Sequence, residues 1–183
     1  MATQLIGAKG DRIMEIESSS GRVQTQAVTE SDMEDRNENG FAWALPFDAI
    51  DPTGADDKFV YIQNTESDLN LHIRRIHVST TVVGFLEVLR VTGTAAGGSG
   101  VTLVNFNEGF ATKTPTGIFE TGSDITALTD AGKYAFQQLT VADTTYEITF
   151  HHDIILNKNG AIALNWVPAT GILTGTVYFF LHE

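Results

Sequence analysis

The densest cluster of potentially reactive side chains is formed by three neighbours, His151, His152 and Asp153. Imidazole and carboxylate groups are common ligands of transition metals, so the two histidines are candidate metal ligands. Adjacent strand residues point to opposite faces, and both histidines can bind one ion only where the strand bends. Otherwise one of them needs partners from the other histidines, which are His72, His77 and His182. The alternative is a pair that faces solvent or a neighbouring subunit, where histidines make assembly sensitive to pH.

A second set of candidate ligands lies in the turn-rich segment from Asp48 to Lys58, which contains four carboxylates: Asp48, Asp51, Asp56 and Asp57. Hard oxygen ligands at close spacing on a glycine-containing loop suit calcium, although the spacing is not that of an EF-hand. The alternative is a solvated acidic loop. Neither set completes a recognised ligand pattern, so the sequence predicts no bound metal and no cofactor. If a metal is bound, the two histidines and the four aspartates are its candidate ligands.

Signatures of catalysis are missing from the chain. There is no Gly-x-Ser-x-Gly motif and no cysteine nucleophile. The glycine-rich segment 94–100 is not followed by Gly-Lys-Ser/Thr, as a phosphate-binding loop requires. Glycosidases need two carboxylates across a cleft, and nothing in the sequence pairs Glu87, Glu120 or Glu147. We therefore predict that the protein is not an enzyme.

Aromatic side chains raise the possibility of carbohydrate binding, because sandwich modules that bind sugars use exposed rings. The candidates are Trp43, Tyr61, Tyr134, Tyr146, Trp166 and Tyr178. Each falls within a strand pattern, and such positions are more often part of the core.

The segment from Lys58 to Thr92 predicts the middle of an antiparallel sheet. Residues 59–62 are all β-branched or aromatic, which suits a pleated surface. The apolar period of two in residues 70–78 slips at Arg74-Arg75, which indicates a bulge or an edge. Residues 85–92 are apolar on both faces, so we expect this strand to be buried on both sides.

Further strands are expected at 41–47, 101–106, 117–121, 134–141, 145–151, 161–167 and 174–182. Residues 122–132 are polar and are expected to form turns. Asn159-Gly160 predicts a hairpin before residue 161, and Pro46 predicts an edge strand or a strand end. Eight or nine short strands predict an all-β fold, an antiparallel β-sandwich of the jelly-roll type. An immunoglobulin-like sandwich is the alternative, without its Cys-Trp-Cys pattern.

Composition excludes several classes of partner. The formal net charge of −12 argues against a nucleic-acid partner, since phosphate contacts need a basic surface. No run of 18 apolar residues and no signal-peptide pattern is present, so we expect no membrane partner. The absence of cysteine fits a reducing cytosol.

The first part of the chain differs from the rest. Residues 1–57 carry twelve acidic and four basic side chains, and residues 30–40 are almost free of apolar ones. Short strands are expected at 13–16 and 22–29. We interpret residues 1–40 as an extended, flexible N-terminal arm and residues 41–183 as the β-sandwich domain. The alternative is a pair of edge strands followed by a loop.

The chain resembles the small β-sandwich structural proteins of tailed-bacteriophage particles. The resemblance is carried by Phe59 to Thr94, with its strand, Asn-Thr, polar turn and second strand, and by the closing strand from Gly175 to His182. It covers roughly residues 41–183 and contains no motif that transfers a functional residue. The nearest type is the capsid decoration, or cement, protein.

That resemblance implies a non-enzymatic virion protein on the capsid surface, made in the host cytoplasm. It implies a homotrimer, or a dimer, that contacts the major capsid protein and bridges shell subunits through an extended arm. The alternative function is a glycan-binding host-recognition module of a tail or fibre tip. That alternative needs exposed aromatic side chains in a groove.

Overall fold

The computed structural model describes residues 5–6, 13–16, 23–25, 36–107, 109 and 113–182. The chain divides into two compact units, residues 1–35 and 36–183. The first contains a small antiparallel sheet of β1 (Leu5–Ile6), β2 (Ile13–Ile16) and β3 (Val23–Thr25). Strand β2 confirms the strand expected at 13–16, and β3 confirms residues 23–25 of the strand expected at 22–29. The remainder of the predicted arm, up to residue 35, lies outside the described residues.

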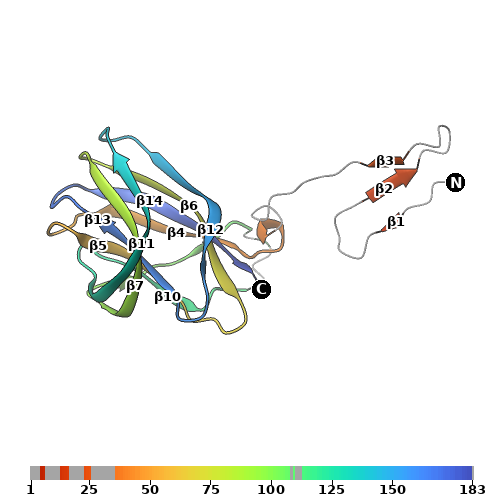
Figure 1. Cartoon of the computed structure of the whole chain (residues 1–183), viewed down its shortest axis with the longest axis horizontal. Coiled ribbons are helices and arrows are strands. Elements are labelled where there is room, and N and C mark those ends of the chain that lie inside the picture. The colour runs from red at the N-terminus through yellow and green to blue at the C-terminus, as the bar shows by residue number, and fades with distance from the viewer. Residues whose placement is uncertain are drawn as a thin grey trace. The chain divides into compact units, whose positions relative to one another are not determined.

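The unit of residues 36–183 consists of two antiparallel sheets packed against each other (Figure 1). One sheet has the order β11-β7-β13-β5-β10-β8 and the other the order β12-β6-β14-β4-β9. The strands are β4 (Ala42–Ile50), β5 (Asp57–Asn64), β6 (Asn70–Thr80), β7 (Gly84–Ala96), β8 (Ser99–Gly100), β9 (Val104–Asn105), β10 (Gly117–Thr121), β11 (Thr126–Leu139), β12 (Tyr146–Leu156), β13 (Ala161–Trp166) and β14 (Leu173–His182). The described residues contain no helix long and apolar enough to cross a membrane.

The order of the long strands is that of a jelly roll. Taken along the chain, β4, β5, β6, β7, β11, β12, β13 and β14 are its eight strands. One sheet contains the first, eighth, third and sixth of these strands side by side in that order (β4, β14, β6, β12), and the other contains the second, seventh, fourth and fifth (β5, β13, β7, β11). This order is the double Greek key of the jelly roll. Strands β8, β9 and β10 are additions between the fourth and fifth strands, and they extend the sheet edges at β5 and β4. The prediction of a β-sandwich of the jelly-roll type is confirmed.

The main core fills the space between the two sheets. It is built from the inward positions of each strand, among them Leu45, Ile76, Trp166 and Phe179, which are fully buried. The period of two places such residues on one face, and their removal from water is the main stabilising contribution of a sandwich. Trp43 and Tyr61 are also buried, as their strand patterns suggest.

A second apolar cluster lies apart from the main core and explains why the middle of β7 is buried on both sides. Leu86 and Val88 of β7 point into the main core, whereas Leu89 and Val91 join the second cluster with Tyr61. Ile125, just before β11, belongs to this cluster, and Leu128, within β11, packs against it. The double burial expected for residues 85–92 holds for Leu86, Val88, Leu89 and Val91, whereas Arg90 and Thr92 are exposed.

Several local features follow the sequence. The pairing of β14 with β6 shifts register at Arg74, because Tyr178 pairs with Arg75 and Phe179 pairs with Ile73. Asn159 adopts a positive φ of 65°, and Gly160 N donates to Asn157 O (2.7 Å) in the predicted hairpin. Pro46 lies on β4 beyond the two residues that pair with β9.

Two strand predictions need correction. Of the residues 122–132 expected to form turns, residues 126–132 belong to the first half of β11 and pair with β7 from Arg90 to Ala96. Their sequence has weak strand propensity, and pairing with a long neighbour overrides it. The strand expected at 101–106 is reduced to the two residues of β9, Val104–Asn105. The side chain of Asn105 donates to the Gly40 carbonyl (2.9 Å).

Candidate functional site

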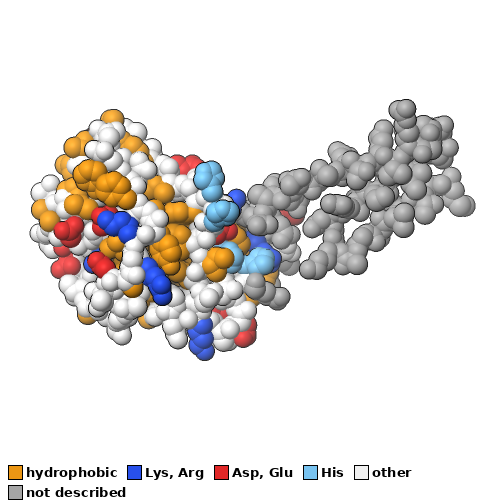
Figure 2. Space-filling model, viewed as in Figure 1, with side chains coloured by type: hydrophobic (Ala, Val, Ile, Leu, Met, Phe, Trp, Pro, Cys, Tyr) orange, Lys and Arg blue, Asp and Glu red, His pale blue; other side chains and the backbone are white. Residues whose placement is uncertain are grey.

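All five histidines of the chain lie on three adjacent strands of the five-stranded sheet. His72 and His77 belong to β6, His151 and His152 to β12, and His182 to β14. In the space-filling view, histidine side chains gather on one side of the sandwich (Figure 2). Because β6 pairs with both other strands, residues about 70 or more positions apart become neighbours. The outer face of this sheet is therefore the strongest candidate for a functional surface.

Tyr178 of β14 is the centre of one cluster on this face. Its neighbours Val177 and Phe179 point into the core, so the period of two directs Tyr178 outward. The ring of Phe106 stacks on it, with ring centroids 5.6 Å apart and an interplanar angle of 14°. The guanidinium of Arg75 lies 4.7 Å from the ring centroid, a cation–π distance. The Tyr178 ring is thus held between an aromatic side chain and a cation.

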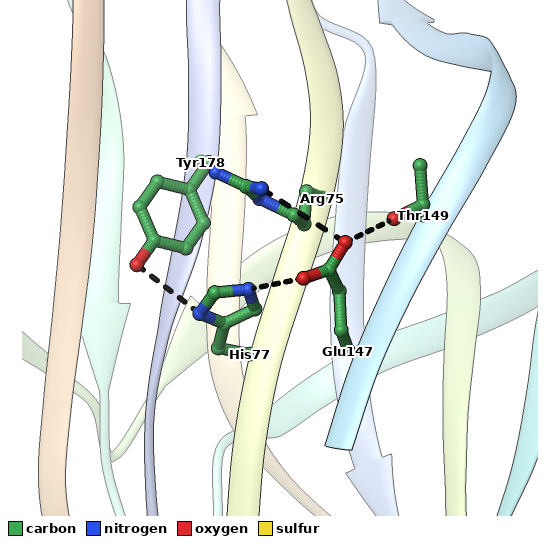
Figure 3. A network of polar contacts seen from close by, with 5 residues as sticks. All are labelled: Arg75, His77, Glu147, Thr149 and Tyr178. Atoms are coloured by element: carbon green, nitrogen blue, oxygen red, sulfur yellow. Dashed lines mark hydrogen bonds and ion pairs between the residues drawn. The ribbon is translucent and has the colours of Figure 1, made fainter. Parts of the chain in front are cut away.

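A polar network extends from Tyr178 across β6 to β12 (Figure 3). The Tyr178 hydroxyl lies 3.3 Å from Nδ1 of His77, and Nε2 of His77 lies 3.0 Å from Oε2 of Glu147. The hydroxyl of Thr149 donates to Oε1 of the same carboxylate (2.8 Å), and Arg75 Nη1 is 3.9 Å from that oxygen. A carboxylate only accepts, so Nε2 of His77 donates to Glu147 in this contact.

The surroundings of Glu147 favour its ionised form. The Thr149 hydroxyl contributes most, followed by His77 and, through its charge, Arg75; together they hold the pKa of Glu147 below its ordinary value despite partial desolvation. Such a carboxylate holds no proton near neutral pH and does not serve as a general acid. The network also contains no serine or cysteine nucleophile. The network places an aromatic ring beside hydrogen-bond donors and acceptors at fixed positions.

A second cluster lies further along the same strands. The ring of His72 stacks on Phe180 at 5.0 Å and lies 5.3 Å from the ring of His182. Asp153 is almost buried; it accepts from Arg74 Nη1 (2.9 Å) and lies 3.6 Å from Nδ1 of His72. Burial lowers the pKa of His72, and the nearby Asp153 carboxylate opposes that shift only in part.

The candidate metal ligands do not converge. His151 and His152 are exposed, in the part of β12 where the pairing with β6 is interrupted between Thr149 and Ile154. Of the predicted trio, only Asp153 contacts the other histidines, through His72. Within the described residues, no three histidine, aspartate or glutamate side chains are placed to hold a metal ion together.

The four acidic candidates do not share one loop, because Asp48 lies on β4, Asp51 and Asp56 lie in the connection that follows, and Asp57 begins β5. The Asp57 carboxylate accepts from Gly54 N (2.6 Å) and from the Thr53 hydroxyl (3.0 Å), so its hydrogen bonds stay within the turn before β5. Asp48 accepts from the Thr174 hydroxyl on β14 (3.0 Å). Asp56 adopts a positive φ of 62°, and its N–H donates to the Val167 carbonyl (3.3 Å). Asp51 is exposed.

Sequence reasoning did not identify the Tyr178 cluster as a site. Its members lie on three separate strands and in the loop after β9, and nothing in their local sequence pairs them. One signal was present: Tyr178 is an aromatic residue at an outward position of a strand whose inward positions are all apolar. Comparisons of this chain with protein-family models, with curated proteins and with solved structures found no match.

Proposed function

We propose that the chain is a non-enzymatic virion structural protein that decorates a bacteriophage capsid and stabilises it by bridging shell subunits. The phage assignment comes from the sequence resemblance. The observation that carries the structural role is that the polar side chains of the candidate surface are paired with one another. Glu147 contacts His77 and Asp153 forms an ion pair with Arg74, so these side chains fix one another in position on the surface.

The division of the chain into two units supports the bridging role. Residues 1–35 and 36–183 form separate compact units on one chain. Two units that bind neighbouring shell subunits raise each other's effective concentration, so weak contacts combine into firm attachment. Binding only to the assembled shell then stabilises that state by mass action. The major capsid protein is the proposed partner.

The test is cosedimentation of the purified full chain with undecorated capsids of the phage that encodes it. We expect saturable binding with a fixed number of copies per capsid. A second protein that lacks residues 1–35 keeps the whole sandwich unit, and it should bind with at least about tenfold weaker affinity because one attachment is lost. Failure of the full chain to bind such capsids at any concentration tested would refute the decoration role.

A second candidate function is glycan binding, and one observation favours it. Phe106 is 41% exposed and is fixed by its stack on Tyr178, while the Glu147 carboxylate and the Arg75 guanidinium lie on the same face. An aromatic ring beside polar groups suits the apolar face and the hydroxyl groups of a sugar.

A glycan array separates this candidate from decoration. Binding to a defined glycan that Phe106→Ala abolishes would favour host recognition. The matched control is Tyr134→Ala, which removes a comparably exposed ring (47%) from the six-stranded sheet. No bound glycan, together with capsid binding that is unchanged in Phe106→Ala, would leave decoration as the function.

A further inference from the structure

The four sheet edges of the sandwich unit differ in how they are protected against pairing with another strand. A sheet edge exposes unpaired N–H and C=O groups, and proteins guard it with short strands, proline, charges or bulges. The edge strands here are β11 and β8 in one sheet and β12 and β9 in the other.

Three of the four edges carry them. Strands β8 and β9 have two residues each, and the part of β4 that β9 leaves uncovered contains Pro46. Strand β12 loses its register between Thr149 and Ile154, and that stretch contains His151, His152 and Asp153. A neighbouring chain would find no long, regular and uncharged strand at any of these edges.

The second half of β11 is different. The register shifts of β11 are confined to its first part, the last of them between Lys133 and Ala135. From Ala135 to Leu139 every residue pairs in register with β7, from Val88 to Gly84. Among the described strands, β11 pairs with β7 alone. The carbonyl of Gln138 accepts from the side chain of Gln137 (3.0 Å), a contact that a pairing strand can replace.

Charge favours a second copy of this chain as the occupant of that edge. The protein carries a formal net charge of −12, so two copies repel each other over most of their surface. The stretch from Tyr134 to Ala142 contains no charged residue and no histidine. Two copies can therefore meet there without placing like charges opposite each other, which would destabilise a strand pair.

Exposed aromatic side chains add an apolar contact at the same place. Phe136 is 54% exposed, and its ring stacks on Phe85 with centroids 4.9 Å apart. The Lys133 ammonium lies 5.6 Å from the Phe136 ring centroid and forms an ion pair with Glu87. Figure 2 shows hydrophobic side chains exposed on the face where β11 runs in Figure 1.

We propose that residues Ala135–Leu139 of β11 pair antiparallel with the same residues of a second copy across a two-fold axis. The two six-stranded sheets then form one continuous sheet, and the contact is self-complementary, as a two-fold interface requires. Phe136 of each copy lies beside the axis on the outer face. This inference does not depend on the proposed function, because it concerns the free protein.

The test is the molar mass of the full chain by light scattering after size exclusion, from about 1 to about 100 μM, a range that spans moderate and weak Kd values. We expect a dimer, with twice the chain mass of 19.8 kDa. Phe136→Lys places two cations beside the axis and should raise the Kd at least about tenfold. The matched control is Ile155→Lys, at a comparably exposed apolar position (51%) of the other long edge strand β12, and it should leave the mass unchanged.

Circular dichroism of both variants establishes that they are folded. Hydrogen exchange provides a second readout that does not depend on a variant: backbone amides of residues 135–139 should be more protected at high than at low protein concentration. A monomer throughout the concentration range would overturn the proposal. So would a trimer, or a dimer that Phe136→Lys and Ile155→Lys affect equally.

Discussion

Nε2 of His77 lies 3.0 Å from a carboxylate oxygen of Glu147, although 70 residues separate the two in the sequence. The pairing of β12 with β6 places them directly opposite each other. On the other side of β6, Tyr178 of β14 pairs with Arg75. The candidate surface is thus a product of strand register, and a change in register would move every outward residue to the core face.

The first prediction concerns the pKa of Glu147. Thr149→Val removes the hydroxyl that contributes most to the low pKa of Glu147, so this pKa should rise toward its ordinary value. Carbon-detected NMR titration of the side-chain carboxyl measures it. The matched control is Thr144→Val, in the loop before β12, which should leave the Glu147 pKa unchanged. An unchanged pKa in Thr149→Val would show that the hydroxyl does not set the ionisation of this carboxylate.

The second prediction concerns pH and stability at His72. Its pKa is lower in the folded protein than the ordinary value of 6.5, so the unfolded chain binds more protons once the pH falls below about 6.5. The contribution of His72 to the free energy of unfolding is therefore fully present above about pH 6.5 and is lost as the pH falls through the folded-state pKa. His72→Phe keeps a ring against Phe180 and removes the titration. Urea unfolding between pH 7 and pH 5 should show a smaller decline in the variant than in the wild type.

The third prediction separates the core from the candidate surface. Phe179 is fully buried and stacks on Phe119 at 5.6 Å, so Phe179→Ala should lower the free energy of unfolding by about 3–5 kcal/mol. Phe106 is partly exposed, and Phe106→Ala should cost less than about 1 kcal/mol. Denaturant unfolding measures both. Equal losses would mean that Phe106 has a role in the core.

The fourth prediction tests the close approach of β14 to β6. A Cβ at Gly175 would overlap the carbonyl oxygen of His77 and would lie 2.6 Å from Cζ of Phe47. Gly175→Ala should therefore reduce the free energy of unfolding by about 1–3 kcal/mol. At Gly100 a Cβ meets no atom within 4 Å, so Gly100→Ala should change stability by less than about 0.5 kcal/mol. Thermal unfolding measures the Tm of both variants. Equal Tm values would contradict the close contact between β14 and β6 at Gly175.

Local patterns predicted most of the fold. The alternation of Ile76 and Val78 with His77, the slip at Arg74 and the Asn159-Gly160 turn each report on a few consecutive residues, and each is reproduced in the structure. The first half of β11 was missed because its residues have weak strand propensity and depend on pairing with β7. Long-range pairing leaves no local signal, which is also why Glu147 and Tyr178 could not be placed beside His77.

The central claim, that the chain stabilises a capsid, is tested most directly by calorimetry of undecorated capsids with increasing amounts of the full chain. Decoration predicts that the temperature of shell disruption rises and then levels off when all sites are filled, because the protein binds the assembled state. The protein without residues 1–35 should give a smaller rise at equal concentration. A disruption temperature that stays constant at saturating protein would contradict the account.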